Sequence, residues 1–460
     1  MAHYDAIVVG AGAAGCSAGA ILAKLGKKVL VVEKDSKPGG RAILMPFGDY
    51  KLAWGPHLIE DPGSGLARIF SFAGKTLEIG AQNDGMSVWG EGGWQPVGSL
   101  YSGEDRAQLR AIVKELIATD YAEFERYDNL PLRSWLAERT SSEGVFSLFE
   151  FISVLEGQTD VWYNHSASDN LYVRKMHFQE RGIPGFSFWP KGGFDKIFQD
   201  LADAIVEHGG EYRVGTVARV VIEGGRVVGV ELERGPKATP NEYPETEVIE
   251  ADNVIVTVPA WDLLRIVDEA ELPSWYADSV KTMASLDNRG NWIQMYVATE
   301  EPVYVNTEKE LQAWFATPRA GLPGFGFLNS ALDPELAPPG KHLFICGVPC
   351  GPEIIRDSRR LRQTFRDFEA DMDEMFPALA RSCIWRRRSV VTNFGLRSQP
   401  GLVGTYRPDN RVPGIDGLYL AGDTYRSRGV GIDRAARSAL TCVELALGQR
   451  IPFFEGTWRY

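Results

Sequence analysis

The sequence has few cysteines and histidines, and it has no long apolar run. Its six histidines are scattered and its cysteines fit no zinc-ligand spacing, so we predict no metal site. We interpret the cysteines as buried thiols of a protein in a reducing cytoplasm, namely Cys16, Cys346, Cys350, Cys383 and Cys442. No apolar run approaches the roughly 18 residues that a membrane-spanning helix needs. The start of the chain has no basic region of the kind that opens a secretory signal, so we expect a cytoplasmic protein without one.

Basic residues are outnumbered by acidic ones. Lysine and arginine number 49 against 61 aspartates and glutamates, which gives a net charge of −12. An acidic chain repels phosphate backbones, so we exclude nucleic acid as a partner. A basic amphipathic helix is also missing, so the sequence does not support peripheral membrane contact, although it leaves such contact open. With 460 residues, 44% of them apolar, the chain is long enough for two to three globular domains; its oligomeric state stays open.

The N-terminal segment has the pattern of a βαβ unit. A short apolar run at 6–9 predicts a buried strand, residues 13–25 predict a helix, and 29–32 predict a second strand. Between the first strand and the helix lies a Gly-x-Gly-x-x-Gly motif, made of Gly10, Ala11, Gly12, Ala13, Ala14 and Gly15. Its glycines permit a tight turn, a close approach of pyrophosphate to the backbone, and close helix–strand packing. This context predicts a dinucleotide site.

Glu33 stands at the end of the second strand of this unit. A carboxylate at that position can accept hydrogen bonds from both ribose hydroxyls of an adenine dinucleotide. The same negative charge disfavours a 2′-phosphate, so we expect NADP not to bind in this pocket.

The segment from Glu33 to Arg41 resembles the FAD-dependent amine oxidase and phytoene desaturase superfamily, in which Gly-Gly-Arg follows the ribose-binding glutamate. The resemblance implies non-covalent FAD as the cofactor, with Lys34 and Gly40 beside it and Arg41 against its pyrophosphate. A guanidinium fork suits two phosphate oxygens, which agrees with this role.

Later segments are similar to the same superfamily. The residues 417–424 look like its second FAD motif, which implies that Gly422 and Asp423 lie near the ribityl-phosphate part. The glycine-rich segment 429–439 is similar to the helix start of phytoene desaturases, which implies that Gly431 and Ile432 face the flavin pyrimidine. By the same resemblance, Val217 contacts adenine, and a segment beside the flavin comprises Gly55, Pro56 and His57. The family often has an acidic residue at the position of Ala53 and a glycine at that of Arg434, so this sequence departs from it twice.

The predicted fold class is α/β, with a Rossmann-like FAD-binding domain and an inserted α+β substrate domain. Strand patterns near residues 5, 30, 212, 254 and 418 supply its parallel sheet. We assign 1–75, 186–288 and 386–450 to the FAD-binding domain, and 76–185 and 289–385 to the substrate domain. Within these ranges, 212–222 reads as one strand-like run, joined to the next strand, 227–232, by a Gly224-Gly225 hairpin.

The resemblance predicts an FAD-dependent oxidoreductase of the phytoene desaturase-like branch. Such an enzyme desaturates or oxidises a hydrophobic or aromatic small molecule by hydride transfer to flavin N5. A flavin-dependent double-bond isomerase and an amine oxidase are the alternatives. The strand at 290–297 carries no lysine, although classical amine oxidases usually place one there, so amine oxidation is disfavoured. A binding protein on the same fold, similar to Rab escort and dissociation-inhibitor proteins, is disfavoured because both FAD motifs are intact.

No acid–base pair stands out in the sequence, and the substrate and the electron acceptor stay open. His57, which can titrate near neutral pH, is one candidate catalytic residue. Tyr425 and Arg426 follow the second FAD motif and are candidates too, although a surface ion pair is favoured for Arg426; Asp433 has similar standing. Aromatic residues suit an apolar substrate but are favoured as core packing, namely Trp162, Tyr163, Phe186, Phe188 and Trp189.

Overall fold

A five-stranded parallel sheet forms the centre of the nucleotide-binding half of the molecule. In the computed structural model, the described residues are 3–55, 58–60, 65–82, 85–157, 160–181, 187–234, 245–305 and 309–455. The strand order is β11 (Glu211–Val214), β3 (Val29–Glu33), β2 (Ala6–Val9), β15 (Val254–Val256) and β21 (Leu418–Leu420), with every pair parallel. These are the five strands predicted from the sequence, so the α/β, Rossmann-like fold is confirmed.

Alternate residues of this sheet enter two different cores. Val8, Val31 and Ile255 pack toward the helices, whereas Ile7 and Val32 pack toward a second sheet. Because successive strand side chains point to opposite faces, a strand buried on both faces has to be apolar throughout. This explains the apolar runs of β2, β3, β15 and β21, whereas the edge strand β11 is partly exposed and carries polar residues.

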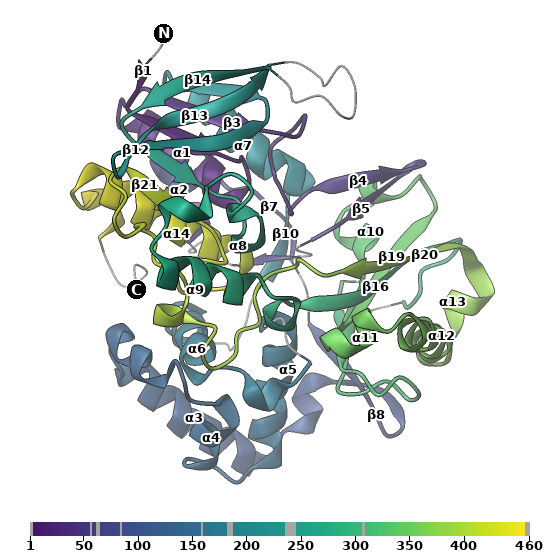
Figure 1. Cartoon of the computed structure of the whole chain (residues 1–460). Coiled ribbons are helices and arrows are strands. Elements are labelled where there is room, and N and C mark those ends of the chain that lie inside the picture. Colours follow the sequence, from purple (N-terminus) through teal and green to yellow (C-terminus); the bar gives the residue numbers. More distant parts are fainter. Residues whose placement is uncertain are drawn as a thin grey trace.

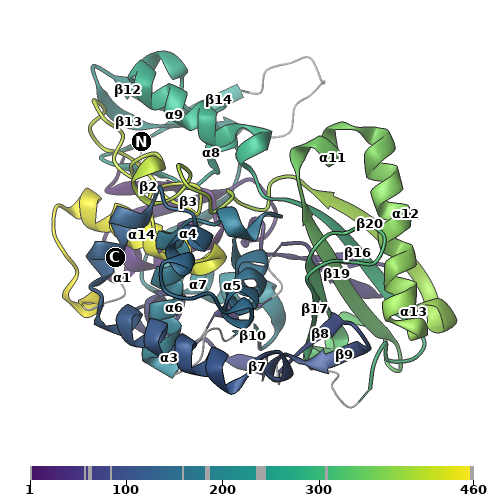
Figure 2. The same cartoon turned by 90° about the horizontal axis from the view of Figure 1, so that it is seen from below.

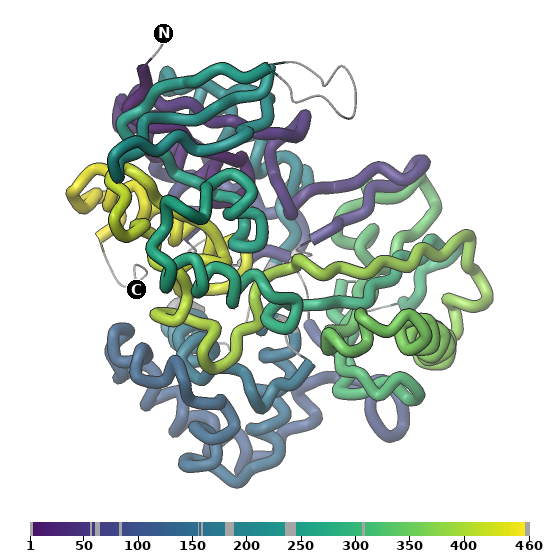
Figure 3. The backbone as a smooth tube through the Cα atoms, viewed as in Figure 1, coloured from purple at the N-terminus to yellow at the C-terminus, as the bar shows by residue number. Residues whose placement is uncertain are grey.

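Helices cover one face of the parallel sheet and a small sheet covers the other (Figure 1). The helical face carries α1 (Ala13–Lys24), α7 (Gly193–Glu207), α14 (Gly431–Leu447) and α2 (Gly65–Phe72). The small sheet has the order β1 (His3–Tyr4), β14 (Glu245–Ala251), β13 (Arg226–Arg234) and β12 (Val217–Glu223). Figure 3 shows that the chain returns at its end to its beginning, where α14 packs against α1.

The predicted hairpin at Gly224-Gly225 is confirmed, but the predicted continuous run at 212–222 is wrong. The hairpin joins β12 to β13, and both glycines have positive φ, 58° and 77°. The run is divided at Gly215-Thr216 into β11 and β12, which belong to different sheets. The amide of Gly215 still donates to the Glu33 carbonyl at 2.7 Å, and beyond it the chain leaves the parallel sheet. Periodicity cannot reveal such a change of sheet, because both halves are strand-like and the pattern does not say which strand each half pairs with.

A seven-stranded sheet forms the second half of the molecule (Figure 2). Its order is β20 (Cys383–Val391), β16 (Asn291–Thr299), β19 (His342–Cys350), β18 (Gly324–Leu328), β17 (Leu311–Trp314), β8 (Met86–Gly90) and β9 (Gly93–Pro96). One face packs against α12 (Ser358–Met375) and α13 (Pro377–Ser382). The other face joins the core that contains α1 and α7.

A group of helices with its own core lies below the nucleotide-binding half in Figure 1. Its members are α3 (Gly103–Ala118), α4 (Leu132–Ala137), α5 (Glu143–Glu156) and α6 (Ala167–Arg181). Smaller elements are α8 (Ala260–Leu263), α9 (Ser274–Ala284), α10 (Asn329–Leu332), α11 (Pro352–Arg356), the hairpin β4 (Leu44–Phe47)–β5 (Tyr50–Ala53), and the sheet β6 (Ile59–Glu60)–β10 (Ser187–Pro190)–β7 (Ile79–Gln82).

None of the helices in the described part of the chain has the length and apolar character needed to cross a membrane. The parallel sheet takes its strands from the three ranges assigned to the FAD-binding domain, and the bounds of those ranges stay a prediction.

Candidate functional site

The glycine motif forms a tight turn between β2 and α1. Gly10 has a φ of +98°, a backbone conformation that favours glycine, and its amide donates to the Val32 carbonyl at 2.8 Å. A Cβ on Gly15 would lie 1.8 Å from the carbonyl oxygen of Gly10, so no side chain fits there. A Cβ on Gly12 would meet only the Cα of Gly40, at 4.0 Å. The turn therefore has no room for a side chain at Gly15, whereas Gly12 is open, with room beside its Cα.

The helix that follows the turn begins without a side-chain cap. Its N-cap is Gly12, no side chain hydrogen-bonds to the cap, and the first turn contains no acidic residue. The first backbone N–H groups, which include those of Ala13 and Ala14, have no partner within the helix. An uncapped N-terminus beside an open glycine is a suitable site for a pyrophosphate.

Glu33, at the end of β3, stabilises this turn by hydrogen bonds. It is buried, and its carboxylate accepts from the Ala11 amide at 2.6 Å and from the Asp35 amide at 2.9 Å. Each carboxylate oxygen can accept a second hydrogen bond, so the predicted contact with ribose hydroxyls remains compatible with these bonds. Lys34 points outward and pairs with Asp35 at 3.0 Å.

Arg41 and Asp423, which are far apart in the sequence, form an ion pair. The Arg41 guanidinium contacts both carboxylate oxygens of Asp423, and it also donates to the Phe394 carbonyl at 3.0 Å. The neighbouring Gly40 packs against the glycine turn, where an added Cβ would lie 3.3 Å from the Cα of Gly12. The two predicted FAD motifs thus meet at one place, a pairing that the sequence did not indicate.

Other predicted cofactor residues lie near this meeting point. A Cβ on Gly55 would be 2.1 Å from the Arg41 carbonyl oxygen, and the amide of Gly422 donates to the Ser438 hydroxyl at 3.0 Å. Gly431 begins α14 with a φ of +46° and has no atom within 4 Å of an added Cβ. The half-buried Ile432 follows it. Val217 begins β12, two residues after Gly215, whose amide donates to the Glu33 carbonyl. Pro56 and His57 lie outside the described residues.

Two of the candidate catalytic residues have partners that favour structural roles. Tyr425 is fully buried in the core and donates to the Val258 carbonyl at 2.8 Å, and burial raises its pKa well above the usual value. Arg426 pairs with Asp409 at 2.7 Å, with both side chains about 40% exposed. This is the surface ion pair that the sequence analysis favoured for Arg426. Their catalytic roles remain predictions without support from this geometry.

Asp433 is buried in the first turn of α14 and is held on both carboxylate oxygens. It accepts from the Gly65 amide at 2.6 Å and from Arg437 Nε at 2.6 Å. Arg437 in turn donates to the Tyr172 hydroxyl of α6 at 3.2 Å. Asp433 therefore connects α2, α6 and α14.

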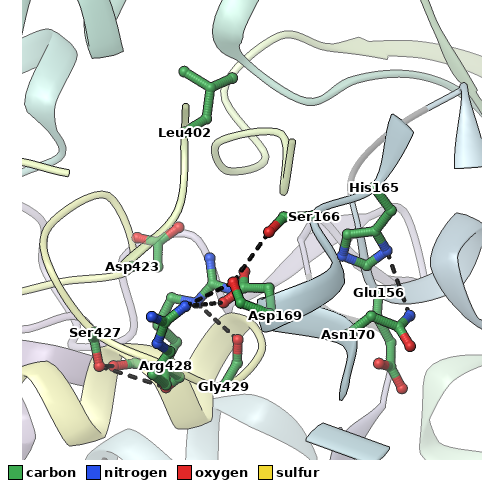
Figure 4. Close-up of polar contacts among 12 residues, drawn as sticks. Glu156, His165, Ser166, Asp169, Asn170, Leu402, Asp423, Ser427, Arg428 and Gly429 are labelled. Atoms are coloured by element: carbon green, nitrogen blue, oxygen red, sulfur yellow. Dashed lines mark hydrogen bonds and ion pairs between the residues drawn. The ribbon is translucent and has the colours of Figure 1, made fainter. Parts of the chain in front are cut away.

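A cluster of buried charges between α6 and the loop before α14 was missed by the sequence analysis (Figure 4). Arg428 pairs with Asp128 at 2.7 Å, and Arg434 pairs with Asp169. A further buried cation, Arg407, donates to the Asp423 carbonyl, and burial lowers its pKa to about 9. The only sequence signal was Arg434 itself, which stands where the similar family often has glycine.

Aromatic side chains extend from the Arg41–Asp423 pair onto the seven-stranded sheet. The ring of Phe394, whose carbonyl Arg41 binds, packs on Trp292 at 5.8 Å between centroids. Trp292 packs on Phe325 at 5.4 Å, and Phe325 stacks with Phe327 at 6.4 Å. This aromatic row was not among the aromatic residues singled out from the sequence.

The aromatic residues that the sequence did single out mostly pack into cores. Trp162 lies in the core of the helical group, whereas Phe188 and Trp189 lie in the core around α1. Tyr163 is half exposed, and Phe186 lies outside the described residues. The core-packing interpretation therefore fits the three buried rings.

Within the described ranges, no three His, Cys, Asp or Glu side chains are grouped so that they could hold a metal ion.

Comparisons with known proteins agree with this geometry. The family model described as flavin containing amine oxidoreductase matches residues 98–447, and an NAD(P)-binding Rossmann-like domain matches residues 8–74. A phytoene dehydrogenase of Streptomyces griseus is 25% identical, over 97% of this chain and 95% of its own length. A phytoene desaturase of Neurospora crassa is 27% identical, over 97% and 85%. The crystal structure of an oxidoreductase from Methanosarcina mazei superposes with a TM-score of 0.75 at 20% identity, covering 95% of this chain and 99% of its own.

The parallel sheet, the open glycine turn and the uncapped helix define a dinucleotide-binding protein of the Rossmann class. The residues fit an adenine dinucleotide, since the backbone donors at the start of α1, the Glu33 carboxylate and Arg41 lie around the glycine turn at one end of the sheet. Because the family match covers most of the chain, the protein belongs to the flavin containing amine oxidoreductase family and is an FAD-dependent oxidoreductase.

Proposed function

We propose that the protein desaturates or oxidises an apolar or aromatic small molecule. Its similarity to phytoene dehydrogenase and phytoene desaturase, each over 97% of the chain, supports an apolar hydrocarbon as the substrate class. Desaturation breaks two C–H bonds, one as hydride and one as proton, and forms a C=C bond. Bound FAD would supply the hydride acceptor.

The chain's own contribution to the cofactor site is a set of fixed donors. The open Gly12 and the N-terminus of α1 would bind the pyrophosphate, and Glu33 would bind the adenosine ribose. Arg41, already oriented by Asp423 and by the Phe394 carbonyl, needs no rearrangement to add positive charge there. Preorganised donors of this kind lower the entropic cost of binding.

The observation that carries the substrate class is the aromatic row of Trp292, Phe325, Phe327 and Phe394. It begins at the residue whose carbonyl binds Arg41, so apolar surface and cofactor motifs adjoin. Phe325 and Phe394 are only half-buried, which leaves ring surface for a ligand. Aromatic rings bind apolar ligands by burial and dispersion, without demanding a charged partner.

The face of β16 that carries Trp292 contains no cation. Its polar groups are Gln294, which donates to the Tyr296 hydroxyl at 3.0 Å, and Tyr296, which donates to the Ala53 carbonyl at 2.7 Å. Burial raises the pKa of Tyr296, and an amide does not titrate. This chain of hydrogen bonds occupies the strand where classical amine oxidases carry lysine, which supports a hydrocarbon substrate over an amine.

His57 is our proposed proton acceptor, on the resemblance of the segment 54–57 to the family. Substitution His57→Gln is expected to lower turnover at least roughly tenfold while FAD stays bound, since general bases contribute about 10² to 10⁴ in rate. Unchanged turnover would remove His57 from the proposal.

The test is the visible spectrum of the purified protein during anaerobic addition of three substrate panels, namely apolar polyenes, phenols and amines. We expect flavin bands that bleach with apolar polyenes and stay unchanged with amines such as putrescine. Bleaching by amines alone would establish an amine oxidase instead. Conversion of a polyene without bleaching or net redox change would establish an isomerase, and a protein that takes up no FAD would refute the flavin site.

A further inference from the structure

The turn between β21 and α14 contains two glycines with positive φ within three residues, Gly429 at 107° and Gly431 at 46°. Glycine loses more conformational freedom on folding than any other residue, so such a turn needs external contacts to hold one conformation. Its single conformation must come from side chains around it.

Arg434 supplies contacts at both ends of this turn. Its Nε donates to the Gly429 carbonyl at 2.8 Å, and its own carbonyl accepts from the Ser427 hydroxyl at 3.1 Å. The backbone amide of Arg434 donates to the Val430 carbonyl at 3.1 Å, which is the first helical bond of α14. The side chain is only 7% exposed, so these bonds are shielded from water.

The outer end of the Arg434 guanidinium contacts a carboxylate from a different helix. Its Nη2 donates to Asp169 in the first turn of α6, and the Asp169 side chain is 2% exposed. Figure 4 shows Asp169 directed from α6 toward the loop that carries Arg428 and Gly429. The buried ion pair of Arg434 and Asp169 thus connects the glycine turn to the helical group.

A second pair runs beside the first. Arg428 bonds Asp128 at 2.7 Å and the Ser168 hydroxyl at 3.0 Å, and it lies 3.8 Å from Asp169. Two arginines therefore face two aspartates, with Arg428 reaching both carboxylates.

The pair of Arg434 and Asp169 matters because of the charge at the start of α14. A helix N-terminus carries a partial positive charge, so a cation in the first turns is unfavourable there unless an anion compensates it. Buried, an uncompensated charge is far more costly than at the surface. Asp169 supplies that compensation for Arg434 from outside the helix.

We propose that Asp169 and Arg434 are a positioning pair that holds the turn Gly429–Gly431 toward the flavin and balances the charge at that end of α14. The proposal rests on the proposed function and on the resemblance by which Gly431 and Ile432 face the flavin pyrimidine. Neither residue need touch the substrate: both act through the backbone of the turn and through the local potential. Arg434 is also where this chain departs from the glycine common in the similar family, so the pair is a feature of this protein.

The experiment measures the midpoint potential of bound flavin in Asp169→Asn, Arg434→Gln and the double variant. Asp169→Asn leaves a cation beside the flavin, which favours the reduced anionic form, so the potential should rise. Arg434→Gln leaves an anion, so the potential should fall. The double variant removes both charges and should return toward the wild-type value. A merely structural contact would not give shifts of opposite sign.

FAD affinity and the stability of the FAD-free protein are measured alongside. Arg434→Gln should weaken FAD binding about tenfold, which corresponds to about 1.4 kcal/mol. Arg434→Lys keeps the charge but loses the planar fork, so it should weaken FAD binding while leaving the potential near the wild-type value. It also serves as the test if the glutamine variant does not fold.

The matched control is the ion pair between Glu115 on α3 and Arg139 after α4, which involves no residue of α6 or α14. Glu115→Gln and Arg139→Gln should leave both potential and FAD affinity unchanged. Shifts of the same sign in Asp169→Asn and Arg434→Gln, or shifts no larger than in the controls, would overturn the positioning pair. Failure of the wild-type protein to bind FAD would refute the proposed function instead.

Discussion

Two segments of this molecule run from a parallel strand through a glycine turn into a helix, and their charges differ completely. The unit β2–α1 enters its helix with Ala13, Ala14 and Gly15, and its first turn contains no acidic residue. The unit β21–α14 places Asp433, Arg434 and Arg437 in its first two turns, all buried.

We attribute the difference to the groups that the proposed site places at the two helix N-termini, pyrophosphate at α1 and flavin at α14. A pyrophosphate brings its own negative charge, so backbone N–H groups and an open glycine suffice, and a carboxylate there would repel it. A flavin ring changes charge during turnover, so the residues beside it set its reduction potential as well as its place. In this proposal, the same order of strand, glycines and helix needs no charges at the pyrophosphate and balanced charges at the flavin.

The largest loss of stability is expected from a substitution in the β2–α1 unit. In Gly15→Ala, the new Cβ would overlap the Gly10 carbonyl, which is 1.8 Å away, so helix and strand must move apart. We expect a loss of stability on the order of 4–5 kcal/mol in the FAD-free protein, together with loss of FAD binding. Thermal or chemical unfolding of the apoprotein measures it; near-wild-type unfolding would show that the packing at Gly15 is looser than the structure has it.

Acid should destabilise the helical group that contacts the second unit, because His165 is buried just before α6. Burial lowers the pKa of His165 to about 4, whereas an exposed histidine titrates near 6.5. Between these values the unfolded state binds more protons, so stability falls as pH falls from about 6.5 to 4, by up to about 3 kcal/mol. His165→Gln should flatten the profile of unfolding free energy against pH in this window. An unchanged slope would exclude His165 as the source.

Loss of the ion pair between the two FAD motifs should reduce the affinity for FAD without unfolding the protein. Asp423→Asn removes the negative partner of Arg41 but keeps the side-chain volume, so Arg41 loses its orientation. We expect FAD binding to weaken by about 2 kcal/mol, or roughly thirtyfold. Titration of the apoprotein with FAD measures it, and Arg41→Lys should give a similar loss because the bidentate fork disappears.

Gly12→Ala sharpens the comparison, because it adds the same atom as Gly15→Ala at an open position. Its φ of −73° suits alanine, and the added Cβ meets no atom closer than 4.0 Å. The stability of the apoprotein should therefore change by less than about 1 kcal/mol, while FAD affinity falls about tenfold because the methyl group obstructs the pyrophosphate. Equal affinity in the variant and the wild type would place the pyrophosphate elsewhere.

The smallest effect is expected at Arg426. Its half-exposed ion pair with Asp409 should contribute no more than about 0.5–1 kcal/mol, so Arg426→Gln should unfold close to the wild type. A large fall in turnover with unchanged stability would instead restore the catalytic role that the sequence allowed for this residue.

Much of the nucleotide-binding half was predictable because its signals are local. Five strand-like runs include the five strands of the sheet, and Gly10, Gly12 and Gly15 occupy the positions that their motif requires. The single run predicted at 212–222 failed at Gly215, because the residues on both sides are strand-like and nothing local says which sheet each half joins. Tyr425 was placed near the site by its neighbours in sequence, yet its hydroxyl is used inside the core by the Val258 carbonyl.

By itself, the sequence determined the strands, the glycine turn and the place of the Glu33 carboxylate at the end of β3, because each depends on residues a few positions apart and on backbone geometry. Tertiary structure alone decided which charges meet: Arg41 with Asp423, and Arg434 with Asp169 from another helix. The physical reason is that an ion pair leaves no periodic trace in the chain. A buried arginine needs acceptors that the fold brings to it, a carboxylate for Arg434 and backbone carbonyls for Arg407, and those partners can come from any distance along the sequence.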